Sequence, residues 1–411
     1  MSLYESVQQN LKEVFSHLQD SYDENLLEPL LHPHKILEVS VPVKMDDGST
    51  KVFTGYRSQH NNNRGPYKWW IRFHQNVSKD EVMSLSVWMT MKTAVVGIPL
   101  GGGKWWVIVN PRELSQNELK QLSKWYMQAI AHDIGADTDI PAPDVNTNAQ
   151  IMARMYDAYV QATGKRTPGV ITGKPLSLGG SAWRDIATSL WGLYVLQEYF
   201  DYHNDSLEWK KIAIQWSGNA GMNFAKLAVK HGAKVIAISD SSGWVYHEDG
   251  LDIKRAEEYK QAGNKFVDFS DGQFISNEEL LLLDVDVLVP AALENQITMD
   301  NASQVRASII LELANGPIAL NANDVLNDKW VVVIPDVLAN AGGVTVSYFE
   351  QVQNNTNYYR PQEEVFEKLE KIIKPATEKV ITTAEQHSTS LRTGAYIVGL
   401  KRILDVSKLT Q

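Results

Sequence analysis

The chain of 411 residues is long enough for two domains, and its 44% hydrophobic and 21% charged residues are typical of a globular protein. Its formal net charge of −10 argues against nonspecific binding to nucleic acid or to anionic membranes. Cysteine is absent, which excludes disulfides and a thiol nucleophile. The sequence has neither a long apolar run nor a secretory signal, so we expect a cytoplasmic protein with no membrane partner.

The first half of the chain has mixed helix and strand patterns. Apolar residues at helical spacing predict a helix over residues 4–18. The runs 36–43 and 51–57 flank Asp46-Asp47-Gly48, which predicts a β-hairpin, and 71–73 is a further strand candidate. Capping boxes predict helix starts after Ser78 and Ser115. The stretch 164–180 is rich in Gly, Pro and Thr and is typical of a functional loop.

The second half alternates strands and helices, as in an open parallel sheet. The predicted strands are 211–215, 234–238, 285–289, 308–312 and 331–334. Helices are predicted over 363–386 and 391–409. We therefore predict an α/β fold with an N-terminal substrate-binding and oligomerisation domain, a Rossmann-type dinucleotide-binding domain, and C-terminal helices that return to the first domain. The predicted boundaries are 1–185, 186–360 and 361–411.

The run Trp216-Ser217-Gly218-Asn219-Ala220-Gly221 has the spacing of a dinucleotide fingerprint except at its first residue, where a glycine belongs. It follows a predicted strand and opens a predicted helix, whose N-terminus would face the pyrophosphate. Asp240 ends the next strand, where an acidic residue binds the adenosine ribose and repels a 2′-phosphate. This pattern favours NAD, with NADP still possible.

Two residues are candidates for acid–base chemistry. Lys104 follows Gly101-Gly102-Gly103, in a run that lacks the residues of a phosphate-binding P-loop. An amine held in such a tight cleft loses its proton easily, although a solvated lysine after a flexible loop is the simpler interpretation. Asp144 lies in a proline-constrained segment and is either a proton shuttle or a turn residue. The scattered histidines predict no metal site, and the absence of a G-x-S-x-G motif weakens an esterase interpretation.

Taken together, many segments resemble the glutamate dehydrogenase (Glu/Leu/Phe/Val dehydrogenase) family, in order and over nearly the whole chain. The resemblance depends on Gly65-Pro66-Tyr67-Lys68, Ile71-Arg72-Phe73-His74, Met89 to Ala94, Gly101 to Lys104, Pro141 to Thr147, Gly173-Lys174-Pro175, Ala314-Asn315-Gly316-Pro317, Pro335-Asp336, Asn340 to Val344 and Ser347-Tyr348-Phe349-Glu350.

The resemblance implies roles for single residues. Lys104 matches the catalytic lysine and Asp144 the aspartate that moves protons at the substrate nitrogen. Lys92 matches the lysine for the α-carboxylate, whereas Lys68 and Ser347 match the pair for the distal carboxylate. The remaining matches lie near the nicotinamide and its phosphates: Thr188, Asn219, Asn315 and Asn340.

The implied reaction is the reversible, NAD(P)-dependent oxidative deamination of L-glutamate to 2-oxoglutarate and ammonia. The resemblance also implies a homo-oligomer, since members of the family are usually hexamers. Lys68 favours a dicarboxylic substrate, because relatives acting on leucine, valine or phenylalanine lack that role. Two alternatives stay open: a dehydrogenase for another amino acid, and a catalytically impaired relative that binds a partner or senses a metabolite.

The tryptophans depart from the family pattern. Ten of the 12 occupy positions that resemble family glycines, whereas Trp88 fits as tryptophan and Trp125 is ambiguous. The ten are Trp69, Trp70, Trp105, Trp106, Trp183, Trp191, Trp209, Trp216, Trp244 and Trp330. Glycine sites with positive φ or close backbone approach accept no large side chain without strain. We hypothesise that UGA encodes glycine in the source organism and was translated as tryptophan, because a single error then explains all ten.

Overall fold

The computed structural model describes residues 2–410, except for the side chain of Trp69. Contacts between Cα atoms divide the chain into two compact units. Unit 1 contains Met1–Arg184, Val344–Phe366 and Tyr396–Gln411, and unit 2 contains Asp185–Gly343 and Glu367–Ala395. The chain thus passes between the units four times.

This division differs from the predicted boundaries in the segment 344–360, which the sequence assigned to the dinucleotide-binding domain. The physical reason lies in helix α11 (Gly342–Thr356), whose side chains bond to the loop 171–180 of unit 1. Glu350 accepts the Gly173 N–H at 2.8 Å and pairs with Lys174 Nζ at 3.0 Å. Asn354 donates to the carbonyl of Gly179 at 2.9 Å. The predicted C-terminal segment is likewise divided between the two units.

Unit 1 is built on a five-stranded mixed sheet in the order β1-β2-β4-β3-β5. The predicted hairpin is confirmed, since β1 and β2 pair in antiparallel register around the turn 45–49. Strand β4 runs antiparallel to β2 and parallel to β3. The strands are β1 (Lys35–Lys44), β2 (Thr50–Asn61), β3 (Tyr67–His74), β4 (Gly101–Ile108) and β5 (Asp139–Pro143).

Helices cover this sheet. Helix α2 packs against β4 and β2, whereas α3 and α4 enclose a hydrophobic core with the strands. Ser78 caps α2 by accepting the Glu81 N–H, and Ser115 and Glu118 form the predicted capping box of α3. The helices are α1 (Leu3–Ser16), α2 (Lys79–Val95), α3 (Gln116–Ile130) and α4 (Ala149–Thr163).

The glycine run at 101–103 belongs to a strand, which the sequence analysis did not predict. Glycine is normally depleted in strands, but here it permits close packing. A Cβ at Gly102 would lie 2.2 Å from the backbone nitrogen of Thr90 on α2. Because side chains alternate along a strand, Lys104 then points to the same side as Gly102, toward α2.

Unit 2 contains a seven-stranded sheet in the order β12-β11-β10-β6-β7-β8-β9, parallel from β12 to β7 and antiparallel at β8 and β9. All five predicted strands are present, with ends shifted by at most two residues. They are β6 (Lys211–Gln215), β7 (Lys234–Ser239), β10 (Val287–Pro290), β11 (Ile309–Leu311) and β12 (Val332–Ile334), and the added edge strands are β8 (Trp244–Tyr246) and β9 (Gln273–Ile275).

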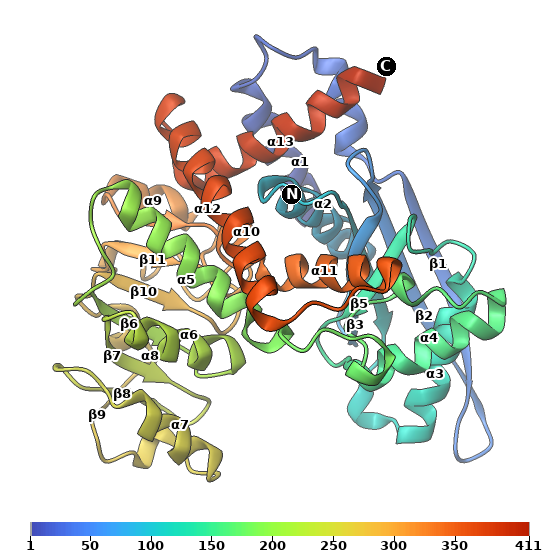
Figure 1. The fold of residues 1–411 in the computed structure, drawn as a ribbon, viewed down its shortest axis with the longest axis horizontal. Coiled ribbons are helices and arrows are strands. Elements are labelled where there is room, and N and C mark those ends of the chain that lie inside the picture. Colours follow the sequence, from blue (N-terminus) through green and yellow to red (C-terminus); the bar gives the residue numbers. More distant parts are fainter. Residues whose placement is uncertain (1, 411) are drawn as a thin grey trace. The chain divides into compact units, whose positions relative to one another are not determined.

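Helices connect these strands, and α6 packs against β6 and β7 (Figure 1). The helices are α5 (Arg184–Tyr202), α6 (Asn219–Lys230), α7 (Ile253–Gln261), α8 (Asn277–Leu281), α9 (Ala322–Asp328) and α10 (Asp336–Ala339). The last two helices, α12 (Gln362–Gln386) and α13 (Leu391–Thr410), agree with prediction and carry the chain between units. Within residues 2–410 no helix has the length and apolar character needed to cross a membrane.

Candidate active site

Lys104 and Asp144 form a buried ion pair in unit 1. Lys104 Nζ lies 2.6 Å from Asp144 Oδ2, and the lysine is 2% exposed. Strand β4 carries the lysine, whereas the aspartate directly follows β5, where its backbone N–H donates to Thr147 Oγ1 at 2.7 Å. Arg72 on β3 adds a second cation, with Nε 3.2 Å from the same carboxylate oxygen. The structure therefore brings the two predicted acid–base residues into direct contact.

Burial shifts the protonation equilibria of this pair in the direction that proton transfer needs. Desolvation lowers the pKa of Lys104 to about 8, against the opposing charge of Asp144. Desolvation acts to raise the pKa of Asp144, but Lys104 and Arg72 outweigh it and hold that pKa well below its usual range. The result is an amine whose pKa lies at about 8, beside a carboxylate that the two neighbouring cations keep ionised.

The other predicted substrate residues of unit 1 are also buried. Lys68 on β3 is fully buried, and its Nζ donates to Thr172 Oγ1 at 2.5 Å and to the Ile140 carbonyl at 3.3 Å. Burial and the nearby charge of Arg184 lower the pKa of Lys68. Ser347 on α11 is 1% exposed, and its hydroxyl has no hydrogen-bond partner among the residues that the structure describes. Lys92 on α2 is buried as well.

Such an environment suits an anionic ligand. A buried lysine bonded to neutral oxygens and a buried hydroxyl without a partner both carry a desolvation cost, which a bound carboxylate would offset. Glu350, one helical turn from Ser347, acts electrostatically on Lys68. Lys68 and Ser347 therefore lie on segments that interact within unit 1.

Two polar residues of this region had no predicted role. Arg72 lies four residues after Lys68 on β3, so strand alternation places both side chains on one face of the sheet. This spacing in the sequence could have indicated a role for Arg72 near Lys68. Thr172 immediately precedes Gly173-Lys174-Pro175, but only the fold shows that its hydroxyl accepts a hydrogen bond from Lys68.

In unit 2 the segment 216–221 forms the turn from β6 into α6. Gly218 is the residue that caps α6, and the helix begins at Asn219. At Gly221 a Cβ would lie 2.0 Å from the carbonyl oxygen of Trp216, so only glycine fits. Lys260 on α7, which the sequence analysis missed, donates to Ser217 Oγ at 2.6 Å. The close packing and a helix N-terminus that no described side chain caps are typical of a pyrophosphate cradle.

Asp240 follows β7, as predicted, and its carboxylate is held in a fixed orientation. Oδ1 accepts hydrogen bonds from the backbone N–H groups of Ser242 and Gly243 at 2.7 and 3.1 Å, and Oδ2 accepts one from the Phe266 N–H at 3.3 Å. Burial acts to raise the pKa of Asp240, but these hydrogen bonds lower it overall. The aspartate is thus ionised and can repel a phosphate.

The remaining predicted cofactor residues also lie in unit 2. Asn340 is 8% exposed, and its Nδ2 donates to the Ala314 carbonyl at 3.1 Å and to Asn315 Oδ1 at 3.0 Å. Asn219 donates to the Asp185 carbonyl at 2.7 Å. Thr188 is half-buried on α5. The structure therefore brings Asn315 and Asn340 together at the carboxyl ends of β11 and β12.

Three of the ten glycine-like tryptophans have left-handed backbones. Trp209, Trp216 and Trp330 have φ values of +66°, +83° and +63°, a conformation that is a genuine outlier for a bulky residue. At Trp216 the indole also covers the cradle, because a Cβ at Gly218 would lie 2.6 Å from its Nε1. Trp106 and Trp191, in contrast, are buried with their indole N–H groups hydrogen-bonded.

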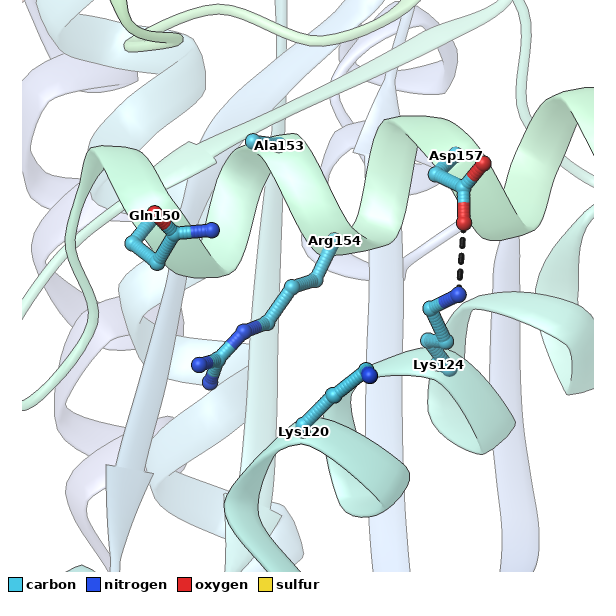
Figure 2. A pocket seen from close by; sticks show the side chains of 6 residues that line it. All are labelled: Lys120, Lys124, Gln150, Ala153, Arg154 and Asp157. Carbon is cyan, nitrogen blue, oxygen red and sulfur yellow. Dashed lines mark hydrogen bonds and ion pairs between the residues drawn. The ribbon is translucent and has the colours of Figure 1, made fainter. Parts of the chain in front are cut away.

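A surface cavity of about 440 Å³ between α3 and α4 contains none of these residues. Figure 2 shows its lining, in which Lys124 pairs with Asp157 at 2.5 Å beside Lys120 and Arg154. The charged side chains are partly solvated, and the buried chemistry lies elsewhere. Among the residues that the structure describes, no three His, Asp or Glu side chains are grouped to hold a metal ion.

A parallel sheet with a glycine cradle after β6 and an ionised aspartate after β7 defines a dinucleotide-binding unit. The buried amine–carboxylate pair of unit 1 adds proton-transfer chemistry. Together these features define a dinucleotide-dependent oxidoreductase with a separate substrate-binding unit.

Comparisons with known proteins identify the family. Residues 33–161 match the model of the Glu/Leu/Phe/Val dehydrogenase dimerisation domain, and residues 179–410 match that of Glutamate/Leucine/Phenylalanine/Valine dehydrogenase. The chain belongs to this family, and the predictions of the family, of the α/β fold and of an oxidoreductase are confirmed.

Individual relatives extend over almost the entire chain. The catabolic NAD-specific glutamate dehydrogenase of Bacillus subtilis is 45% identical, covering 99% of this chain and 96% of the relative. The NADP-specific glutamate dehydrogenase of Synechocystis is 46% identical over 98% and 96%. Glutamate dehydrogenase from Peptoniphilus asaccharolyticus has a similar solved structure, with a TM-score of 0.90, 38% identity, and coverage of 100% and 99%. The hetero-hexameric enzyme of Thermus thermophilus, in a leucine-bound form, gives a TM-score of 0.91 at 34% identity, covering 100% and 97%.

Proposed function

We propose that this protein catalyses the reversible oxidative deamination of L-glutamate to 2-oxoglutarate and ammonia, with NAD as its cofactor. The observation that carries the proposal is the buried Lys104–Asp144 pair, in the same unit as a second buried lysine, Lys68. Relatives that are 43–46% identical and named NAD- or NADP-specific glutamate dehydrogenases support the reaction and the cofactor class.

The residues of unit 2 fit a nicotinamide dinucleotide, with one exception. Gly218, Gly221 and the N-terminus of α6 would hold the pyrophosphate, and Asp240 the adenosine ribose. When bound, the nicotinamide supplies the redox step by exchanging hydride with the substrate α-carbon. The exception is Trp216, whose indole covers Gly218 at the helix N-terminus.

The chemistry of this chain's own residues is proton transfer and carboxylate binding. In its neutral form Lys104 takes a proton from the water that attacks the substrate imine, and Asp144 carries protons to and from the substrate nitrogen. Lys68 and Ser347 bind the distal carboxylate, and Lys92 binds the α-carboxylate. The burial of Lys68 and Lys92 supports carboxylate binding, because the attraction between an ammonium group and a carboxylate is stronger in a low dielectric.

A kinetic comparison of two substrates tests the substrate assignment. We expect Lys68→Ala to raise KM for glutamate sharply, because the side-chain carboxylate then lacks its cation, and to leave slow turnover of leucine almost unchanged. Ser115→Ala, which removes the side-chain cap of helix α3, is the control for a general loss of stability. Equal effects on both substrates would contradict the assignment.

We further propose that the native chain carries glycine at the ten tryptophan positions. The left-handed backbones at Trp209, Trp216 and Trp330 support this proposal, as does the indole over the cradle. Intact mass of the protein from its native source tests it, since each exchange of tryptophan for glycine shifts the mass identifiably. UGG codons at these positions, or tryptophan in the native protein, would defeat it.

We propose a cytoplasmic homo-hexamer. The family model over residues 33–161 is named a dimerisation domain, and a structurally similar relative is described as hetero-hexameric. Light scattering coupled to size-exclusion chromatography measures the assembly, and a monomeric mass at micromolar concentration would contradict the proposal.

A further inference from the structure

In unit 2 one arginine joins two loops at the carboxyl ends of neighbouring strands. Arg392, at the start of α13, donates from Nη2 to Glu312 Oε1 at 2.7 Å, and its Nη1 lies 3.6 Å from Asp336 Oδ1. Glu312 directly follows β11, and Asp336 begins α10 after β12. We call these three residues the carboxylate–guanidinium cluster.

The cluster also fixes the backbone of both loops. Glu312 Oε2 accepts the Asp336 N–H at 2.8 Å, which ties the second loop to the first. Asp336 Oδ2 accepts the Gly316 N–H at 3.0 Å, which ties the first loop to the second. Arg392 Nε donates to Asn323 Oδ1 at 3.1 Å, so the guanidinium itself is held in place from α9. The two loops therefore have one common support.

These loops carry the two asparagines that the structure brings together. Asn315 lies between Glu312 and Gly316 in the first loop, and Asn340 ends the short helix that Asp336 begins. Ligands of open α/β sheets bind at the carboxyl ends of the strands, which is this edge. A change in the cluster would shift the polar groups at this edge of the sheet and leave the cradle after β6 in place.

The environment of the cluster makes its geometry sensitive to each member. Glu312 is fully buried and Arg392 is 17% exposed. A buried carboxylate needs an opposite charge and hydrogen bonds to stay in place, and a planar guanidinium can satisfy two carboxylates at once, which an ammonium group cannot do in the same geometry.

We propose that Arg392 is a positioning residue, which acts through Glu312 and Asp336 to hold the two loops in the arrangement that binds the nicotinamide half of the dinucleotide. The inference rests on the proposed function, since it assumes that unit 2 binds NAD. It adds a determinant of affinity that lies more than 170 residues beyond the glycine fingerprint in sequence. A purely structural role for Arg392 would instead weaken every ligand of unit 2 alike.

The test compares a ligand that contains nicotinamide with one that lacks it. Binding of NADH and of ADP-ribose is measured by calorimetry on the full chain carrying Trp216→Gly, with and without Arg392→Met. We expect Arg392→Met to weaken NADH about tenfold or more and to change ADP-ribose less than twofold. Lys329→Met is the matched control, because Lys329 also donates two hydrogen bonds in unit 2. Its acceptors are the carbonyls of Ser303 and Val305, which precede the amino end of β11.

Each outcome either supports or contradicts the positioning role of Arg392. Equal weakening of both ligands by Arg392→Met, or no change in either, would overturn the positioning role while leaving the dinucleotide site intact. A parent chain that binds neither ligand would remove the dinucleotide site and the inference with it. If Arg392→Met does not fold, Arg392→Lys carries the test, with a selective loss for NADH of about threefold expected and a loss for both ligands contradicting the proposal.

Discussion

The left-handed tryptophans give the sharpest prediction about the backbone of unit 2. We compare glycine with alanine at Trp209, Trp216 and Trp330, so that both triple variants lose the same three indoles and differ only at Cβ. An L-residue with a Cβ costs about 1–2 kcal/mol in the left-handed region, and the greater freedom of glycine in the unfolded chain offsets about 0.5–1 kcal/mol of this. The net advantage of glycine is therefore about 0.5–1 kcal/mol per site, or about 2 kcal/mol for three.

The control uses a tryptophan of similar exposure with a helical backbone. Trp125 in α3 is 48% exposed, between Trp216 at 39% and Trp209 at 68%. There alanine should be more stable than glycine by about 1 kcal/mol, because glycine is a poor helix former. The sign of the glycine–alanine difference is thus expected to reverse between the left-handed positions and Trp125.

Thermal or denaturant unfolding of the full chain measures these differences. For a unit of this size about 1 kcal/mol corresponds to roughly 2–4 °C in Tm, so the glycine triple variant should unfold about 4–8 °C above the alanine triple variant. Equal stability of the two triple variants, or a more stable alanine variant, would refute the assignment of left-handed, glycine-type backbones to these positions.

The other predictions concern titration, substrate and cofactor. The pKa of Lys104 is lowered to about 8 and its neutral form acts as the base, so kcat for glutamate deamination should rise as pH increases through about 8. A kcat that stays constant between pH 7 and 9 would contradict this role. Lys68→Ala should raise KM for glutamate about 30-fold, equivalent to about 2 kcal/mol, and a change below threefold in initial-rate assays would argue against a distal-carboxylate role. Burial raises the pKa of Glu312 to about 7 from its ordinary value of 4.5, so the folded state binds more protons than the unfolded state between these two pH values. The free energy of unfolding should therefore fall by about 3 kcal/mol as pH rises across that window. Glu312→Gln should remove this slope in urea titrations, and an unchanged slope would show that another group causes it. Asp240→Ser should raise kcat/KM for NADP about tenfold or more by removing the charge that repels a 2′-phosphate, whereas an unchanged cofactor ratio would assign selectivity elsewhere.

The sequence predicts the dinucleotide turn well because its information is local. Strand, glycines, helix and acidic residue follow one another within 30 residues, so spacing alone places Gly218, Gly221 and Asp240. Lys104 was singled out for the same reason, as an amine behind three glycines. Its contact with Asp144 was expected only from the family resemblance, because Lys104 lies on β4 and Asp144 follows β5, 40 residues further along the chain.

Other features depend on contacts that no local pattern contains. The strand β4 was missed because its three glycines are typical of loops, and only the packing of α2 explains them. Arg392 and Glu312 lie 80 residues apart, and neither has a neighbouring motif that predicts their ion pair. The same limit applies to Thr172, whose hydroxyl accepts a hydrogen bond from Lys68 across 104 residues.

Formation of NADH from L-glutamate and NAD tests the central claim most directly. The chain is made with glycine at the ten tryptophan positions and compared with the same chain carrying Lys104→Met. We expect steady turnover of glutamate that Lys104→Met lowers roughly 10²–10⁴-fold with the fold intact. Absence of turnover in the glycine-containing chain, or undiminished turnover after loss of the Lys104 amine, would contradict the account.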